Sequence, residues 1–138
     1  MRRNKNRADS ERGAAAVEFA LIAPLLFMLI FGIIQFGLAW SQKEIFIQAA
    51  REGARYAAVG CEDAGGCEDG QVEARVTDAL VGYEVNDDIA VDPGQGCSPT
   101  NGDDVVTVGW DQQFDIDIPF VPPVTVTAPI EAVFRCEL

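Results

Sequence analysis

The amino-acid sequence predicts an α+β protein in which a long N-terminal transmembrane helix continues into a small external domain. Three observations predict this fold class: an uncharged apolar run from Phe19 to Trp40, helical patterning that continues to Gly60, and short alternating apolar segments beyond residue 88. A chain of 138 residues has room for an anchor and one small domain. We expect that domain to contain a short helix and a sheet of three or four mostly antiparallel strands.

Charge is distributed unevenly along the chain. Residues 1–13 carry five basic and two acidic side chains, residues 14–42 carry Glu18 alone, and residues 43–138 carry five basic and 19 acidic side chains. Basic residues beside a membrane span gather on the cytoplasmic side, and an acidic domain is untypical of nucleic-acid binding. We therefore expect a basic cytoplasmic leader at 1–13, a transmembrane helix at 14–42 and an external α+β domain at 43–138, with no nucleic-acid partner.

The apolar run has the length of a membrane span. Its 22 residues, Phe19–Trp40, would extend about 33 Å as a helix, close to the roughly 30 Å of a hydrocarbon core. Pro24 is tolerated in membrane helices and is expected to kink this one. A cleaved secretory signal is the competing interpretation, with a cut after Gly37-Leu38-Ala39, but the run is longer than such signals. The lipid bilayer is thus the first expected partner.

Helical patterning continues after the span, in KEIFIQAAREGARYAAVG. We expect one continuous helix from about Ser10 to Val59. Small residues would let another helix or a sheet approach it closely: Ala49, Ala50, Gly53, Ala54, Ala57 and Ala58. The segment Arg51-Glu52-Gly53-Ala54-Arg55 is a possible helix contact surface, with an ion pair possible between Glu52 and Arg55. Packing on the protein's own domain and binding of a partner both remain open for it.

A second, short helix and the strands complete the expected domain. Val72, Val76 and Leu80 recur at a spacing of four, which predicts a helix over 71–81 that ends at Gly82. Alternating patterns predict strands at Asp88–Asp92, Val105–Trp110, Gln113–Ile118, Val124–Thr127 and Ala132–Cys136. Prolines predict an irregular link at Pro119, Pro122 and Pro123, and Pro129 is expected to break the chain between the last two strands.

All four cysteines fall in the expected external part, where an oxidising compartment lets disulfides persist. We favour Cys61–Cys67, closing a glycine-rich turn, and Cys97–Cys136, tying a loop to the last strand; the sequence alone permits three pairings. Zinc is the rival interpretation. The chain has no C-x-x-C pair and no histidine, so we expect no metal.

The sequence contains no recognisable catalytic constellation. Without histidine the chain lacks the usual general base, and Ser10, Ser41 and Ser98 lack the context of a nucleophile. The acidic stretch CEDAGGCEDG invites a calcium hypothesis, but it lacks the ligand order of an EF-hand loop. We expect no enzyme, no catalytic residue and no cofactor.

The start of the helix resembles a prepilin signal. Basic residues lead to Gly13, and Ala14-Ala15-Ala16-Val17-Glu18-Phe19 opens the apolar helix. A glycine at the cut with a glutamate fifth after it is similar to the class III signal of type IV pilins and pseudopilins. More narrowly, RGAAAVEFALIAPLLFMLIFGIIQFG followed by QAAREGARYAAVG resembles the TadE-like family of tight-adherence pilus assembly systems, over about Arg12–Gly60.

This resemblance implies a pilin-like fold and a minor pseudopilin of a type IVb, Flp-type pilus assembly or secretion system, in the bacterial cytoplasmic (inner) membrane. It implies cleavage between Gly13 and Ala14 by a prepilin peptidase. The other implied partners are further pseudopilins and inner-membrane platform proteins. The alternative function is a membrane-anchored extracytoplasmic binding module that captures an external ligand or ion.

Glu18 and Phe19 are implied to take part in subunit assembly. An ionised carboxylate near the membrane boundary is costly unless it is paired, and the new N-terminal amine of a neighbouring subunit would be its partner. The alternative is a first-turn acid that the helix dipole favours and lipid headgroups hydrate.

Overall fold

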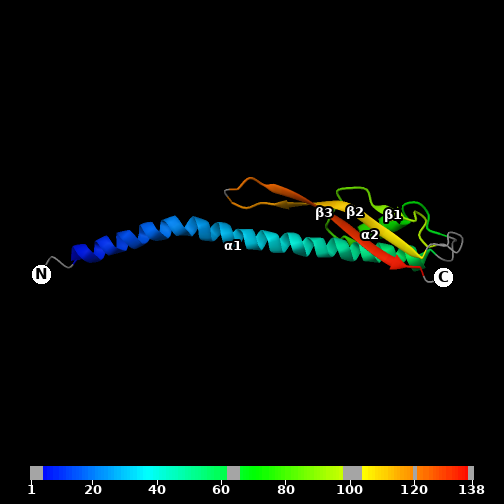
Figure 1. Ribbon diagram of the computed structural model, residues 1–138, viewed down its shortest axis with the longest axis horizontal. Helices are drawn as coiled ribbons and strands as arrows, with labels where there is room; N and C mark the ends of the chain where they lie inside the picture. Colours follow the sequence, from blue (N-terminus) through cyan, green and yellow to red (C-terminus); the bar gives the residue numbers. More distant parts are fainter. Residues whose placement is uncertain (1–4, 62–65, 98–103, 120, 137–138) are drawn as a thin grey trace.

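The computed structural model describes residues 5–61, 66–97, 104–119 and 121–136. One long helix, α1 (Lys5–Arg55), runs through the molecule, and a small α+β unit covers its second half (Figure 1). We call the end of α1 from Phe46 onward, together with the elements that pack around it, the head. These elements are the π-helical turn η1 (Tyr56–Gly60), helix α2 and three strands. The predicted α+β fold class is confirmed.

The long helix is continuous, as predicted, and longer at its start than the expected Ser10. It passes through Pro24 without a break and bends gently in its first half (Figure 1). Proline removes one helical hydrogen bond and clashes with the preceding turn, which accounts for a bend in this part of the helix. At the other end α1 widens into η1, which finishes at Gly60, the expected stop.

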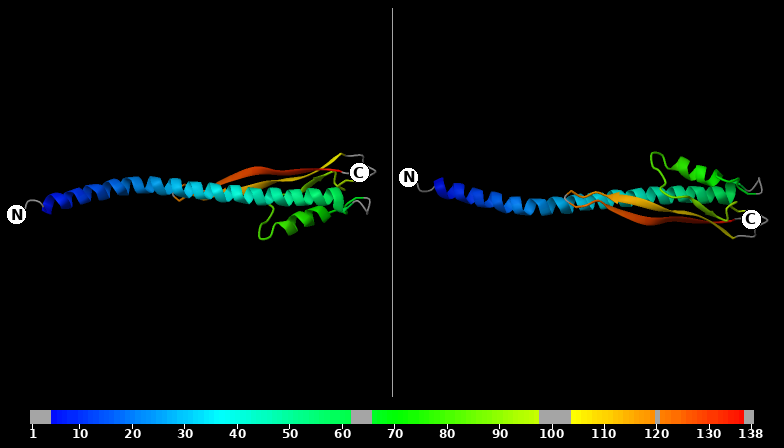
Figure 2. Two further views of the ribbon diagram at one scale, coloured as in Figure 1. Left: turned by 90° about the horizontal axis from the view of Figure 1, so that it is seen from below. Right: turned by 90° about the horizontal axis from the view of Figure 1, so that it is seen from above.

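The short helix α2 (Gln71–Ala79) packs against α1 through Val72 and Val76, both buried. It ends two residues before the predicted Val81. The Leu80 N–H donates to the Thr77 carbonyl at 3.1 Å, a bond to the third residue back that tightens and closes the last turn. Figure 2 shows α2 on one side of α1 and the sheet on the other. The head is therefore built around the end of the long helix.

The sheet has three antiparallel strands in the order β1 (Ala90–Asp92), β2 (Val105–Ile116) and β3 (Val124–Arg135). Three antiparallel strands agree with the prediction, but β2 joins the two segments expected as separate strands. Asp111 and Gln112 do not interrupt it, because the alternation of outward and inward side chains continues through them. Together β2 and β3 form a long hairpin.

Pro129 was expected to end a strand and instead lies inside β3, opposite Asp111. The prediction of a break is wrong because β3 is an edge strand of the sheet. Proline has no N–H, so Pro129 and Asp111 can only form a pair without mutual hydrogen bonds, and the proline nitrogen faces the outer edge. No ladder bond is lost there.

The core lies between the inner face of the sheet and the second half of α1. Phe46 of α1 makes edge-on ring contacts with Tyr83, Trp110 and Phe114, at centroid distances of 5.8, 6.3 and 5.9 Å. The polar side chain of Gln112 is buried with them and is 3% exposed. Its Oε1 accepts a hydrogen bond from Trp110 Nε1 at 3.0 Å, so burial leaves this oxygen satisfied.

Two disulfides close the head, and they are the two pairs that the sequence analysis favours. Cys61 is bonded to Cys67, directly after η1, and Cys97 is bonded to Cys136, after β3. The Cys97 N–H also donates to the Ala57 carbonyl at 3.0 Å. The turn η1, the loop before β2 and the end of β3 are thereby held together.

Candidate functional site

The residues of the expected processing site lie on an uncovered stretch of α1. Gly13, Ala14 and Glu18 are all exposed, and Phe19 is 66% exposed. A Cβ built on Gly13 would meet nothing within 4 Å, so the fold of this chain does not require glycine there. Ala14 and Glu18 are four residues apart and share one face of the helix. The segment is thus open to another molecule.

The apolar residues after this segment are largely exposed, although from Gly32 onward the hairpin partly covers one face of the helix. Large exposed hydrophobic side chains run from Val17 to Trp40, among them Leu21, Leu25, Phe27, Ile33 and Phe36. A helix that is apolar all round is stable in lipid or in a protein core, and the buried core of the head begins only at Phe46. In the part of the chain that the structure describes, α1 contains the one segment long and apolar enough to cross a membrane. It is suited to single-pass anchoring.

The segment 51–55 is divided between the head's interior and its surface. Gly53 and Ala54 are buried under the head, whereas Arg51 and Arg55 are exposed. A Cβ on Gly53 would overlap Val76 Cγ2 and lie 3.7 Å from Val108 Cγ1. The small residues of this helix therefore allow α2 and the sheet to approach α1 from two sides.

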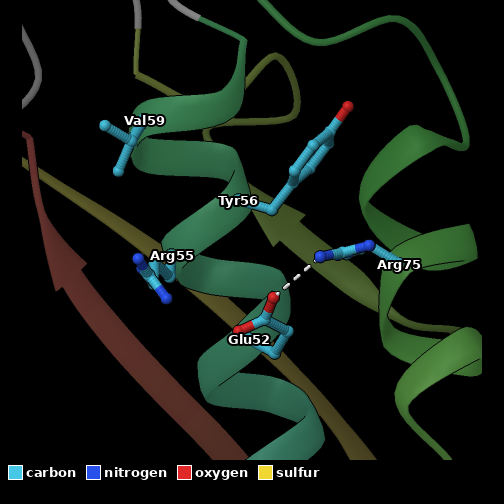
Figure 3. Close-up of a pocket in the computed structure, with 5 residues that line it drawn as sticks. All are labelled: Glu52, Arg55, Tyr56, Val59 and Arg75. Atoms are coloured by element: carbon cyan, nitrogen blue, oxygen red, sulfur yellow. Dashed lines mark hydrogen bonds and ion pairs between the residues drawn. The ribbon is translucent and has the colours of Figure 1, made fainter.

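Glu52 pairs with an arginine that no local sequence pattern indicates. Its Oε1 lies 3.1 Å from Arg75 Nη2 of α2, so Glu52 pairs between helices and not within α1, where a pair with Arg55 was possible. The Arg75 guanidinium also lies over the Tyr56 ring, 5.9 Å from its centroid. Figure 3 shows Arg75 reaching from α2 between Glu52 and Tyr56, with Arg55 turned away. These residues and Val59 line a shallow surface pocket.

Glu52→Gln is expected to lower the free energy of unfolding by less than about 1 kcal/mol. The two side chains of the pair are 38% and 50% exposed, and exposed ion pairs contribute little because water screens them. Chemical denaturation at low and high salt measures the loss, which should shrink as salt rises. A loss above about 2 kcal/mol that persists in salt would contradict this assignment.

Residues 13–55 match the family model of TadE-like proteins. The resemblance stated from the sequence is thereby confirmed over this stretch. The match begins at Gly13 and ends with the last residue of α1. Comparisons with curated proteins and with solved structures gave no match.

The TadE-like segment thus contains two different surfaces of one helix. Its first half is the uncovered apolar stretch with Gly13 and Glu18, and its second half carries the small residues on which the head packs. The sheet and α2 lie outside the match.

A metal site receives no support from the described residues. Nowhere in 5–61, 66–97, 104–119 or 121–136 do three acidic or cysteine side chains gather in a way that could hold an ion. Residues 62–65 of the acidic stretch considered for calcium, and Ser98, lie outside the described residues.

Two contacts made by this helix have no local signal in the sequence. Arg75 meets Glu52 across 23 positions, and Ile118 of the hairpin meets Gly32 of the apolar run. Both contacts join residues that are distant in the sequence. They arise from the way α2 and the hairpin lie along α1 in the folded chain.

Proposed function

We propose that this chain is a membrane-anchored, minor pseudopilin-like component of a tight-adherence (type IVb, Flp-type) pilus assembly or secretion system. The observation that carries the proposal is the uncovered apolar half of α1, which opens with Gly13 and Glu18 and lies within the TadE-like match. The leader is cytoplasmic and the head is extracytoplasmic, because the basic residues precede the span. The membrane is the bacterial inner membrane.

In this function the chain acts by binding rather than by catalysis. A prepilin peptidase removes residues 1–13, which takes away five basic side chains and leaves a new amine on Ala14. Glu18 then pairs with the new amine of a neighbouring subunit, so that assembly offsets the cost of a carboxylate in lipid. Phe19 and the apolar side chains after it contact lipid or neighbouring pseudopilins, and platform proteins receive the assembled helices.

Processing is tested by intact mass and N-terminal sequencing of the protein from membranes of cells that express its own pilus machinery. The native chain and a Gly37→Val control are expected to start at Ala14. Gly13→Val is expected to start at Met1, because a branched side chain next to the scissile bond blocks the peptidase. Gly37 serves as the control because a Cβ there meets nothing within 4 Å, as at Gly13.

Glu18→Gln separates processing from assembly. The variant is expected to start at Ala14 and yet to abolish pilus formation, because an uncharged amide cannot pair with the amine. A native chain that starts at Met1 would contradict the role of Gly13. A start at Trp40 in the soluble fraction would contradict membrane anchoring itself.

A further inference from the structure

The turn of the β2–β3 hairpin lies beside the apolar half of α1, beyond the rest of the head. A Cβ built on Gly32 would be 3.8 Å from Ile118 Cδ1, which places this turn well inside the apolar run Phe19–Trp40. Figure 1 and Figure 2 both show the hairpin, in yellow and orange, running back along α1 past the other elements of the head. A head that stayed wholly in water would not reach this level of the helix.

The surfaces that meet here are apolar. Apolar side chains of α1 and the hairpin line one groove, which continues the apolar surface of the anchor helix and has Lys43 as its one charged lining residue; the others are Phe36, Ala39, Trp40, Phe114, Ile116, Val126 and Ala128. Charged side chains are absent from the sequence of the hairpin turn. Asp115 and Asp117 are the last carboxylates of β2 and its extension, and residues 118–130 contain no ionisable side chain.

The backbone of the turn is suited to a medium with little water. We call residues 118–119 and 121–124 the tip segment. Unpaired N–H groups are costly in lipid, but Pro119, Pro122 and Pro123 have none. The Val121 N–H donates to the Ile118 carbonyl at 3.1 Å. Fewer unsatisfied donors remain than in an ordinary loop, so the part of the desolvation cost that comes from backbone N–H groups is reduced.

We propose that the tip segment enters the lipid leaflet on the head's side, at the boundary between headgroups and acyl chains. The proposal rests on membrane anchoring by α1, as given under the proposed function. On that side of the membrane, the boundary of the hydrocarbon core then lies near Gly32 instead of Trp40. Asp117 lies on the aqueous side of this boundary. The hairpin, and not lipid, covers one face of α1 from there to the head.

This boundary changes which residues span the membrane. Twenty helical residues extend about 30 Å, the thickness of the hydrocarbon core, and the twenty that end at Gly32 begin at Gly13. Arg12 then lies at the opposite boundary. Glu18 lies about 8 Å inside it, where its need for a partner is greater than at a hydrated surface.

The depth of the tip is measured by quenching of tryptophan fluorescence with brominated phospholipids. The full chain is reconstituted in bilayers with Trp40→Phe, which leaves Trp110, buried in the head, as a constant background. Three variants add one tryptophan each: Val121→Trp in the tip, Val133→Trp at the opposite end of the hairpin, and Leu25→Trp in the anchor. Val133 is a matched control because it is an exposed valine, 56% exposed, on the same hairpin.

Bromines on the upper acyl chain are expected to quench Val121→Trp several-fold more than Val133→Trp, and deeper bromines are expected to quench Leu25→Trp most. Equal, weak quenching of Val121→Trp and Val133→Trp beside strong quenching of Leu25→Trp would overturn tip insertion and leave anchoring intact. Weak quenching of Leu25→Trp would overturn both the anchoring and the tip insertion that rests on it.

Discussion

Gly53→Leu is expected to lower the free energy of unfolding of the head by about 3 kcal/mol, because it forces α2 away from α1. Even a Cβ at this position would overlap Val76 Cγ2, and it would lie 3.6 Å from Val72 Cγ1. Val72 and Val76 are buried and β-branched, so neither can rotate aside without strain. Near-ultraviolet circular dichroism of the full chain in detergent, followed through a denaturant titration, measures the loss.

Gly37→Leu is the matched control for this prediction. Both glycines lie inside α1, and leucine favours a helix over glycine by about 1 kcal/mol at either position. A Cβ at Gly37 meets nothing within 4 Å, so this variant should keep the stability of the native head. Equal stability of the two variants would show that α2 tolerates displacement and would contradict the close packing assigned to Gly53.

Removing the Cys97–Cys136 disulfide is expected to destabilise the head by about 4 kcal/mol, against about 2 kcal/mol for Cys61–Cys67. The first bond joins residues 39 positions apart and the second joins residues only six apart. A longer closed loop restricts the unfolded chain more, so its loss is more costly. The Cys97→Ser, Cys136→Ser variant and the Cys61→Ser, Cys67→Ser variant are compared by denaturant midpoint.

The second variant controls for general effects of replacing cysteine by serine, since both lose two sulfur atoms. A smaller loss at the long-range bond would contradict the prediction. It would mean that other contacts hold the two ends, such as the 2.9 Å hydrogen bond from Cys136 N–H to the Asp104 carbonyl.

Local patterns were enough to predict most of the elements of this fold. The apolar run and the small residues after it predicted one continuous helix, and the spacing of Val72, Val76 and Leu80 predicted α2. Both signals come from neighbours along a single helix, where a period of 3.6 residues decides which side chains share a face. The glycine-rich turn between Cys61 and Cys67 likewise favoured the short disulfide that the structure contains.

Features that depend on pairing over a distance were predicted less well. The sequence predicts a break at Pro129, because sequence alone does not reveal that β3 lies at the edge of the sheet. The sequence predicts two strands separated at Asp111-Gln112. Only the fold supplies Trp110 and Glu84 as hydrogen-bond partners for the buried Gln112 amide. At the candidate site, the exposed apolar helix was foreseen, whereas Arg75 and the reach of Ile118 to Gly32 follow from tertiary contacts.

The proline in the middle of β3 has a consequence for how copies of this chain can meet. The outer edge of β3 has no neighbouring strand among the described residues, and its 12 residues would otherwise offer a long template for edge-to-edge aggregation. Pro129 presents a ring there in place of a donor, so an added strand would lose a hydrogen bond near the centre of its ladder. Heads of neighbouring copies, when crowded together, are thereby discouraged from fusing into one continuous sheet.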